Sequence, residues 1–512
     1  MSTTKDKCLE SIFASNRPPS PQESSVAGES LQLCDQKLEV VDTRIADLEH
    51  ELEELKAQRA TIKKERHRYV DILSARRLIP PEIIGRFMEL ACVDTKPESS
   101  QSSGTYQQVL SFMLVSREWY RTACGVAHFW TELDMDLTEY SAEETEQIII
   151  KANNRFARAA ELPLSLHLAF SAAVPTNTLI TGFIHSLTPR LGVFSFRIQV
   201  DSISELQILT SVLHHPASSS TLVWPRLHTL RIDIHSEHEI TADYELSNPL
   251  TNFPLLSKAA ISSPHIIFAL RQMPWSNLSS LDLGPLRQLE TRQYLSILEE
   301  CINLRSLRLC MKRQIGTDQL NNSVPVTALP HLTHLHVENT DTQESRMGRL
   351  LSRLKLPSLR SCILTTLNDG GYYTSIIAKL AELFQRSECS ESMEYLELNL
   401  ARGLAHRPDT LGHLFRQVPR LTALKLSGYK MDIDALRGVP LSIRNLSVKL
   451  SYYRIDDART AFVEYLNSRF ADSDEPMKAQ LSVVDTVTTV LIRQNLDTLR
   501  NNVGSSLDVA MD

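Results

Sequence analysis

The stretch Pro330-His331-Leu332-Thr333-His334-Leu335-His336-Val337 carries the pattern that decides the fold. It has the form L-x-x-L-x-L, with valine in the last place. The same form, with other apolar residues allowed, recurs along the second half of the chain as Leu227/Leu230/Ile232, Leu278/Leu281/Leu283, Leu304/Leu307/Leu309, Leu332/Leu335/Val337, Leu359/Cys362/Leu364, Met393/Leu396/Leu398, Leu421/Leu424/Leu426 and Ile443/Leu446/Val448. These triplets begin 51, 26, 28, 27, 34, 28 and 22 residues apart, which brackets a repeat of about 20 to 29 residues with insertions.

This spacing predicts an α/β fold, a leucine-rich-repeat-like solenoid over residues 160–470. Each unit would supply one short strand and one helix, whose apolar faces are covered only when the next unit stacks on them. Helical returns are predicted over 291–301 and 373–384, and a proline before several strands stops the preceding helix. The alternative is a globular α/β domain that is rich in leucine. Between Asp233 and Leu278 the repeat boundaries are undefined.

In this register the apolar triplets point inward and the alternating residues point to a concave face. That face is predicted to bind a protein substrate through Arg231, Arg308, His334, His336, Tyr395, Glu397 and Lys425, with Thr229, Asp233, Ser306, Glu338, Asn399, Asn445 and Lys449 beside them. Charges of both signs suit a polar protein or peptide ligand. His334 and His336 share a strand face, but zinc needs three or four ligands, so a polar surface pair explains them better.

A compact apolar module is predicted over residues 77–135. Pro81 suits a helix start, because its fixed φ is already helical and its missing amide hydrogen is not needed there. Further helices are predicted around Val109–Leu114 and after a capping Ser116. Three short helices are too small to bury both Trp119 and Trp130, so part of this apolar surface is expected to meet another protein. The alternative is an ordinary three-helix core segment.

Leu78-Ile79-Pro80-Pro81-Glu82-Ile83-Ile84 with Phe87, then Leu114-Val115-Ser116-Arg117-Glu118-Trp119, then Phe129-Trp130, resembles an F-box in the form common among fungal F-box proteins. The resemblance departs from the family at Ile79 and in the longer polar stretch 95–105. It implies docking on a Skp-type adaptor, which links the chain to a cullin-based ubiquitin ligase. The residues that it places at the adaptor are Leu78, Pro80, Pro81, Ile83, Ile84, Phe87, Leu114 and Trp119.

A coiled-coil helix is predicted over 31–76. Its heptad a positions are Leu31, Leu38, Ile45, Leu52, Arg59, Arg66 and Leu73, and its d positions are Cys34, Val41, Leu48, Leu55, Ile62 and Tyr69. In a parallel homodimer the g and e residues would pair as Lys37–Asp42, Arg44–Glu49 and Glu51–Lys56, all of opposite sign, which favours self-pairing through 31–73. The alternative is a single helix folded back on its own chain.

Residues 1–30 are predicted to be disordered. The tail 471–512 includes a possible helix over 484–499.

Composition excludes several classes of protein. The chain has 512 residues, of which 42% are hydrophobic, and a net charge of -7, which argues against nucleic acid as a partner. No run of about 18 apolar residues and no apolar leader occurs, so we expect a soluble protein of the cytoplasm, the nucleus or both, without a membrane partner. The eight cysteines form no C-x-x-C pair, which predicts buried, reduced thiols and neither disulfides nor zinc. No phosphate loop, dinucleotide fingerprint or nucleophile turn occurs, so we expect no enzyme and no cofactor.

Together these features predict a substrate-receptor subunit of a cullin-based, SCF-type ubiquitin ligase, acting in the ubiquitin conjugation pathway. In this hypothesis the F-box docks on the adaptor and the solenoid captures a protein target of unknown identity. The alternative is a non-degradative scaffold protein that dimerises through its coiled coil and binds a stable partner through the solenoid.

Overall fold

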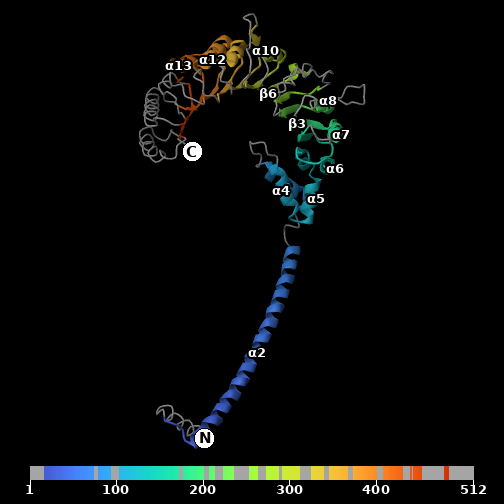
Figure 1. Ribbon diagram of the computed structural model, residues 1–512, viewed down its shortest axis with the longest axis vertical. Helices are drawn as coiled ribbons and strands as arrows, with labels where there is room; N and C mark the ends of the chain where they lie inside the picture. Colours follow the sequence, from blue (N-terminus) through green and yellow to red (C-terminus); the bar gives the residue numbers. More distant parts are fainter. Residues whose placement is uncertain are drawn as a thin grey trace. The chain divides into compact units, whose positions relative to one another are not determined.

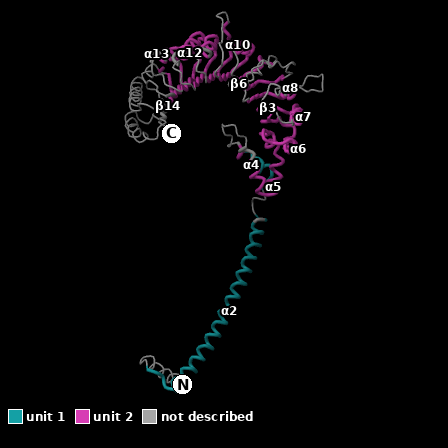
Figure 2. Tube along the Cα trace, in the orientation of Figure 1, with its two compact units in different colours: residues 1–89 teal, residues 90–512 magenta. Residues whose placement is uncertain are grey.

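The computed structural model describes residues 17–73, 79–93, 103–171, 177–200, 207–213, 223–235, 253–262, 273–286, 291–311, 325–339, 345–366, 373–400, 408–429, 439–440, 442–451 and 478–483. The chain divides into two compact units, residues 1–89 and 90–512 (Figure 2). Residues 1–16, Leu78 and the predicted helix 484–499 lie outside the described part of the chain.

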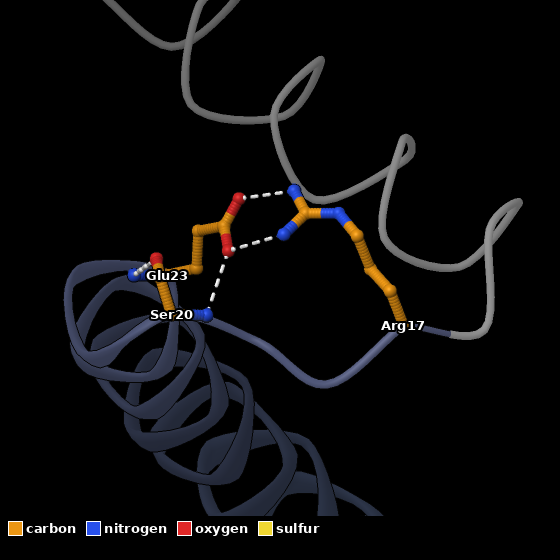
Figure 3. A network of polar contacts seen from close by, with 3 residues as sticks. All are labelled: Arg17, Ser20 and Glu23. Atoms are coloured by element: carbon orange, nitrogen blue, oxygen red, sulfur yellow. Dashed lines mark hydrogen bonds and ion pairs between the residues drawn. The ribbon is translucent and has the colours of Figure 1, made fainter.

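The first unit contains α2 (Pro21–Ile72), a single helix of 52 residues. It begins at a capping box: the Glu23 amide donates to Ser20 Oγ at 3.4 Å, and the Ser20 amide donates to Glu23 Oε2 at 2.8 Å. The Arg17 guanidinium forms an ion pair with the same carboxylate, and its Nη2 atom lies 2.7 Å from Glu23 Oε1 (Figure 3). The predicted disorder of residues 21–30 is therefore wrong, because Ser20-Pro21-Gln22-Glu23 starts the helix ten residues before the predicted start of the coiled coil.

Short helices follow close to the places that the sequence predicts, and after them comes a 3₁₀ turn that it does not predict. They are α3 (Pro81–Val93), α4 (Ser103–Met113), α5 (Arg117–Gly125) and the 3₁₀ turn η2 (Ala127–Trp130). Pro81 is the first residue of α3, and Ser116 caps α5 by accepting the Trp119 amide at 3.2 Å. Residues 103–105, the end of the polar stretch 95–105, belong to α4.

A parallel sheet of thirteen strands dominates the described residues of the second unit. The strands follow one another in chain order, and every neighbouring pair is parallel. They are β1 (Glu132–Asp136), β2 (Leu164–Ser171), β3 (Leu191–Gln199), β4 (Thr229–His235), β5 (Lys258–Ser262), β6 (Ser280–Leu286), β7 (Ser306–Met311), β9 (His334–Asn339), β11 (Ser361–Thr366), β12 (Tyr395–Leu400), β13 (Ala423–Tyr429), β14 (Asn445–Ser451) and β15 (Lys478–Val483). A separate two-stranded ladder joins β8 (Thr327–Ala328) to β10 (Leu354–Lys355).

The sheet extends beyond the predicted bounds of 160–470. β1 lies within the segment 77–135 that was predicted to be all helical, and β15 lies within the predicted tail. Both boundaries are therefore corrected, because each of these short strands pairs with a neighbour along most of its length.

Helices connect many of the strands. They are α6 (Ala142–Ala157), α7 (Asn177–Leu187), α8 (Gln207–Leu213), α10 (Thr291–Glu300), α11 (Ser345–Ser352), α12 (Tyr373–Ser387) and α13 (Pro408–Arg416), with 3₁₀ turns η4 (Trp275–Asn277) and η5 (Cys389–Glu391). The helices predicted over 291–301 and 373–384 are thus confirmed with small shifts at their ends. From α10 to α13 each helix contacts the next, so they form a row beside the sheet (Figure 1).

The predicted inward orientation of the eight apolar triplets is confirmed. Each member of every triplet is at most 2% exposed. Fully burying one side chain of this size stabilises the folded protein by about 1.5–3 kcal/mol. The strands therefore turn the face that carries the triplets away from water.

The predicted triplets do not include β3 or β5, although Leu191/Phe194/Phe196 in β3 fits the form once other apolar residues are allowed. Phe194 and Phe196 replace leucine in β3, and Ala259 occupies the middle place in β5, where Leu256 and Ile261 flank it. β5 divides the 51-residue interval into steps of 29 and 22 residues, counted from Leu227 to Leu256 and on to Leu278.

The turns before the strands also repeat. Just ahead of a strand, a side-chain hydroxyl donates a hydrogen bond to the backbone carbonyl just ahead of the preceding strand of the sheet: Ser279 to Ser257 at 3.0 Å, Thr333 to Arg305 at 3.0 Å and Thr422 to Glu394 at 2.9 Å. These bonds satisfy backbone carbonyls in each turn and fix the register of the next strand.

Candidate functional site

The side chains that alternate with the buried triplets form the open face of the sheet. Most of them are exposed or half-buried among the described side chains, whereas Glu397 in β12, Cys310 in β7 and Gly284 in β6 are buried. The middle row of this face carries Arg231, Asp282, Arg308, His336, Glu397 and Lys425, in strand order.

The predicted substrate-binding residues do not form one site. Arg231 in β4 and Lys425 in β13 are separated by seven strand-to-strand steps along the sheet, about 34 Å at the usual strand spacing. The sheet instead gathers them, with other residues, into two separate polar clusters.

The first cluster centres on Arg308. Its guanidinium lies 3.6 Å from an oxygen of Asp282 and 3.3 Å from an oxygen of Glu338, on the strands to either side. His336 is paired with Arg308 in the register, and burial, followed by the positive charge of Arg308, lowers its pKa. Burial raises the pKa of Asp282, although Arg308 opposes this change. The Arg308 side chain is still 49% exposed, so it can exchange one of these carboxylates for an acidic group of a ligand.

The second cluster centres on Glu397, which is only 8% exposed. The Tyr395 hydroxyl donates to one carboxylate oxygen, while Lys425 Nζ at 2.9 Å and Asn399 Nδ2 at 2.8 Å share the other. Burial alone would raise the pKa of Glu397, but these three donors outweigh it and lower the pKa. Burial and the bond to Glu397 raise the pKa of Tyr395. Asn399 accepts in turn from Ser427.

The remaining predicted residues lie apart from these contacts. Arg231 is exposed on β4, where its charge still acts on Asp282. His334 is exposed at the start of β9, and its Nδ1 atom lies 2.8 Å from Thr333 Oγ1.

Sequence reasoning missed Asp282 and Ser427 in the two clusters, and it missed Arg197, which contacts Asp233 at 3.4 Å in a third group. Asp282 and Ser427 alternate with buried triplet residues, so the same rule of alternation, applied to every strand, would have found them. Arg197 could not be found in this way because β3 itself was not recognised.

Helix α3 presents a second kind of surface. Ile83, Phe87 and Leu90 are 59%, 56% and 55% exposed, at the spacing of one helix face, while Ile84 and Met88 are buried. Ile84, which the resemblance places at the adaptor, is only 2% exposed and belongs to the packed face instead. Pro80 and Pro81 are exposed at the start of the same helix.

A further apolar surface lies around the turn between α4 and α5. Leu114 is 87% exposed and Val115 is 60% exposed, while Trp119 is half-buried with its ring 6.0 Å from that of Phe112. The module does not bury both tryptophans, as its size predicts, and the one that it covers is Trp130. That side chain is 3% exposed, and its Nε1 atom donates to the Ala123 carbonyl at 3.1 Å.

The cysteine side chains are mostly core residues. Cys92, Cys301, Cys310, Cys362 and Cys389 are buried free thiols, whereas Cys34 is exposed. Burial raises the pKa of Cys301 to about 12 and that of Cys389 to about 11, so these thiols stay protonated and unreactive.

Across the described ranges, no group of three or more His, Cys, Asp or Glu side chains is placed to hold a metal ion. The helices among these residues include none that combines the length and the apolar character needed to cross a membrane.

No family model matches the sequence, and no curated protein matches it.

Proposed function

We propose that the protein is a substrate-receptor subunit of a cullin-based ubiquitin ligase and has no catalytic activity of its own. The apolar face of α3 would bind a Skp-type adaptor, and the open face of the sheet would bind the protein target. The observation that carries the proposal is the exposure of Ile83 and Phe87, large apolar side chains at the position where the F-box resemblance expects an adaptor.

Partner binding supplies a physical reason for this exposure. Fully burying an apolar side chain of this size stabilises by about 1.5–3 kcal/mol, so a folded chain that leaves several of them in water gains by covering them with another protein.

For the second unit we propose a leucine-rich-repeat-like solenoid whose concave surface is the open face. Parallel strands in chain order, steps of 22 to 34 residues between most triplets and repeated turn hydrogen bonds support this proposal. Cations and carboxylates alternate along the open face, which suits a ligand with charges of both signs, such as a polar protein segment in the cytoplasm or nucleus.

Affinity purification from cells tests the adaptor half of the proposal. The double variant Ile83→Asp with Phe87→Asp should lose the Skp-type adaptor and the cullin, because charged residues cannot be buried in an apolar interface without large cost. Ile150→Asp is the matched control, since Ile150 is also apolar and 45% exposed but lies on α6. Absence of the adaptor from the unaltered protein would overturn the proposal.

Charge reversal tests the target half. Arg231→Glu with Arg308→Glu should remove the proteins that depend on the open face while keeping the adaptor. Lys151→Glu, an exposed cation on α6, should keep both. Unchanged binding of every partner to the double variant would count against the open face as the recognition surface.

The second candidate is a scaffold that binds a stable partner without degradation. The exposed apolar residues of α2 favour it, because they provide an interaction surface that needs no ligase. The same purification separates the two, since a scaffold should bring down no adaptor at all.

A further inference from the structure

Helix α2 leaves a long apolar seam in water, interrupted only by Arg59 and Arg66 among its described a and d positions from Leu31 to Tyr69. Its apolar a and d side chains are between 48% and 65% exposed, and no described side chain of α2 is buried: Leu31, Leu38, Val41, Ile45, Leu48, Leu52, Leu55, Ile62 and Tyr69. A helix of 52 residues is about 78 Å long. A seam of this length on an isolated helix favours association with another helix.

We propose that two copies of the chain pair through α2 in antiparallel orientation. In this arrangement an a residue of one helix faces a d residue of the other, and the central layer joins Leu52 to Leu55 of the second copy. The layers outward from it join Ile45 to Ile62 and Leu38 to Tyr69. The inference is independent of the proposed ligase function, because none of these residues belongs to the adaptor-binding or target-binding surfaces.

The two arginines of the seam decide the direction. In a parallel dimer Arg59 would face Arg59 of the second copy, and Arg66 would face Arg66, so two layers of the core would hold like charges. In the antiparallel dimer Arg59 faces Leu48 and Arg66 faces Val41. Each long side chain can then cover an apolar partner with its methylene groups while its guanidinium reaches water.

Flanking charges agree with this register. Antiparallel helices place e residues beside e residues and g residues beside g residues, which pairs Asp42 with Lys63, Glu49 with Lys56, and Arg44 with Glu65, all of opposite sign. The parallel register offers as many attractive pairs, so the flanking charges are compatible with both directions and the core layers discriminate between them.

The flanking charges also determine how far one helix is shifted along the other. Sliding one antiparallel helix by a single heptad would place Glu49 beside Glu49 and Glu51 beside Glu51 in one direction, and Lys56 beside Lys56 and Glu51 beside Glu65 in the other. These contacts are repulsive, and the register proposed above avoids them.

The mass of the full chain in solution tests the pairing. Light scattering should give twice the 57.8 kDa of one chain. Val41→Lys should reduce the mass to that of a monomer, because the new cation would face Arg66. Val40→Lys is the matched control: Val40 is 70% exposed on the same helix but lies outside the seam, so this variant should remain a dimer. A monomeric unaltered chain, or equal effects of both variants, would overturn the proposal.

Disulfide cross-linking tests the direction in the full chain. In a Cys34→Ser background, Leu38→Cys and Tyr69→Cys are prepared separately, oxidised alone and oxidised as a mixture. An antiparallel dimer should cross-link only in the mixture, since residues 38 and 69 of different copies face one another and two residues 38 are about 46 Å apart. Cross-linking of each variant alone would show a parallel dimer and would overturn the proposed orientation. The Cys34→Ser chain without a new cysteine is the control for other thiols.

Discussion

At the residue scale, Glu397 shows how the open face stabilises a buried charge. The carboxylate is almost fully covered by protein, and it remains ionised because Tyr395, Asn399 and Lys425 all donate to it. A buried charge with several fixed donors is expensive to leave unpaired, so each donor contributes to the stability of β12 and β13.

The pH dependence of stability should reveal this cluster. Because the pKa of Glu397 is lowered in the folded protein, its contribution to stability is complete above the ordinary glutamate pKa of about 4.3 and is lost as the pH falls through the folded pKa. Lys425→Met should destabilise the protein by about 1 kcal/mol at pH 7, since Lys425 is half-exposed, and the difference should shrink towards pH 3. Denaturant titrations at both pH values measure it. Lys449→Met, an exposed lysine on β14, is the control, and an equal, pH-independent effect of both variants would contradict the expectation.

A second prediction at the residue scale concerns Gly284 in β6. A side chain at this position would overlap the hydroxyl, Cβ and backbone Cα of Ser262 on β5. Gly284→Ala should therefore destabilise the protein by about 1–3 kcal/mol, and the loss should be smaller in a Ser262→Gly background. Gly182→Ala should have the opposite sign, because Gly182 lies in α7 with nothing near the new methyl group. Thermal unfolding of the four variants would check this coupling.

At the element scale, capping residues fix where the helices begin. Ser116→Ala should cost about 1 kcal/mol in the free energy of unfolding, because the Trp119 amide loses its acceptor, and Ser116→Asp should retain most of the stability. Equal losses in both variants, measured by denaturant unfolding, would mean that the hydroxyl acts through packing and not through the cap.

Element positions were predictable from the sequence where the signal is chemical and local. Pro81, Ser116 and the eight triplets predicted helix starts and buried strand residues correctly. The start of α2 was missed because the polar composition of residues 17–30 was read as disorder, although Ser20-Pro21-Gln22-Glu23 holds a complete capping signal. β5 was missed because alanine buries too little apolar surface to stand out in a pattern of leucines.

At the scale of the whole molecule, the buried triplets should dominate stability. Leu335→Ala, in a strand at the middle of the sheet, should cost about 2–5 kcal/mol, because it leaves a cavity among residues that are already close-packed. His334→Ala, next to it in sequence but exposed, should change the free energy of unfolding by less than about 0.5 kcal/mol. Similar losses in the two variants would contradict the assignment of the buried face.

The candidate site was only partly predictable at this scale. Alternation along a strand predicts which residues face outward, and it placed Arg308, Glu397 and Lys425 correctly on the open face. Which of them meet depends on the order of strands and on the lengths of the connections between them. Arg231 and Lys425 are therefore far apart, while Arg308 and the unpredicted Asp282 are neighbours.

The strand order has a consequence for how such a chain can change length. Each strand of the thirteen-stranded sheet is hydrogen-bonded only to the strands of that sheet that come before and after it along the chain, so no strand of this sheet must be threaded between two others. Duplication or loss of one internal strand with its turn would leave the route of the rest of the polypeptide intact. A gene encoding this chain can thus lengthen or shorten the open face of the sheet in whole steps of one strand spacing, while the polar residues on the retained strands are kept.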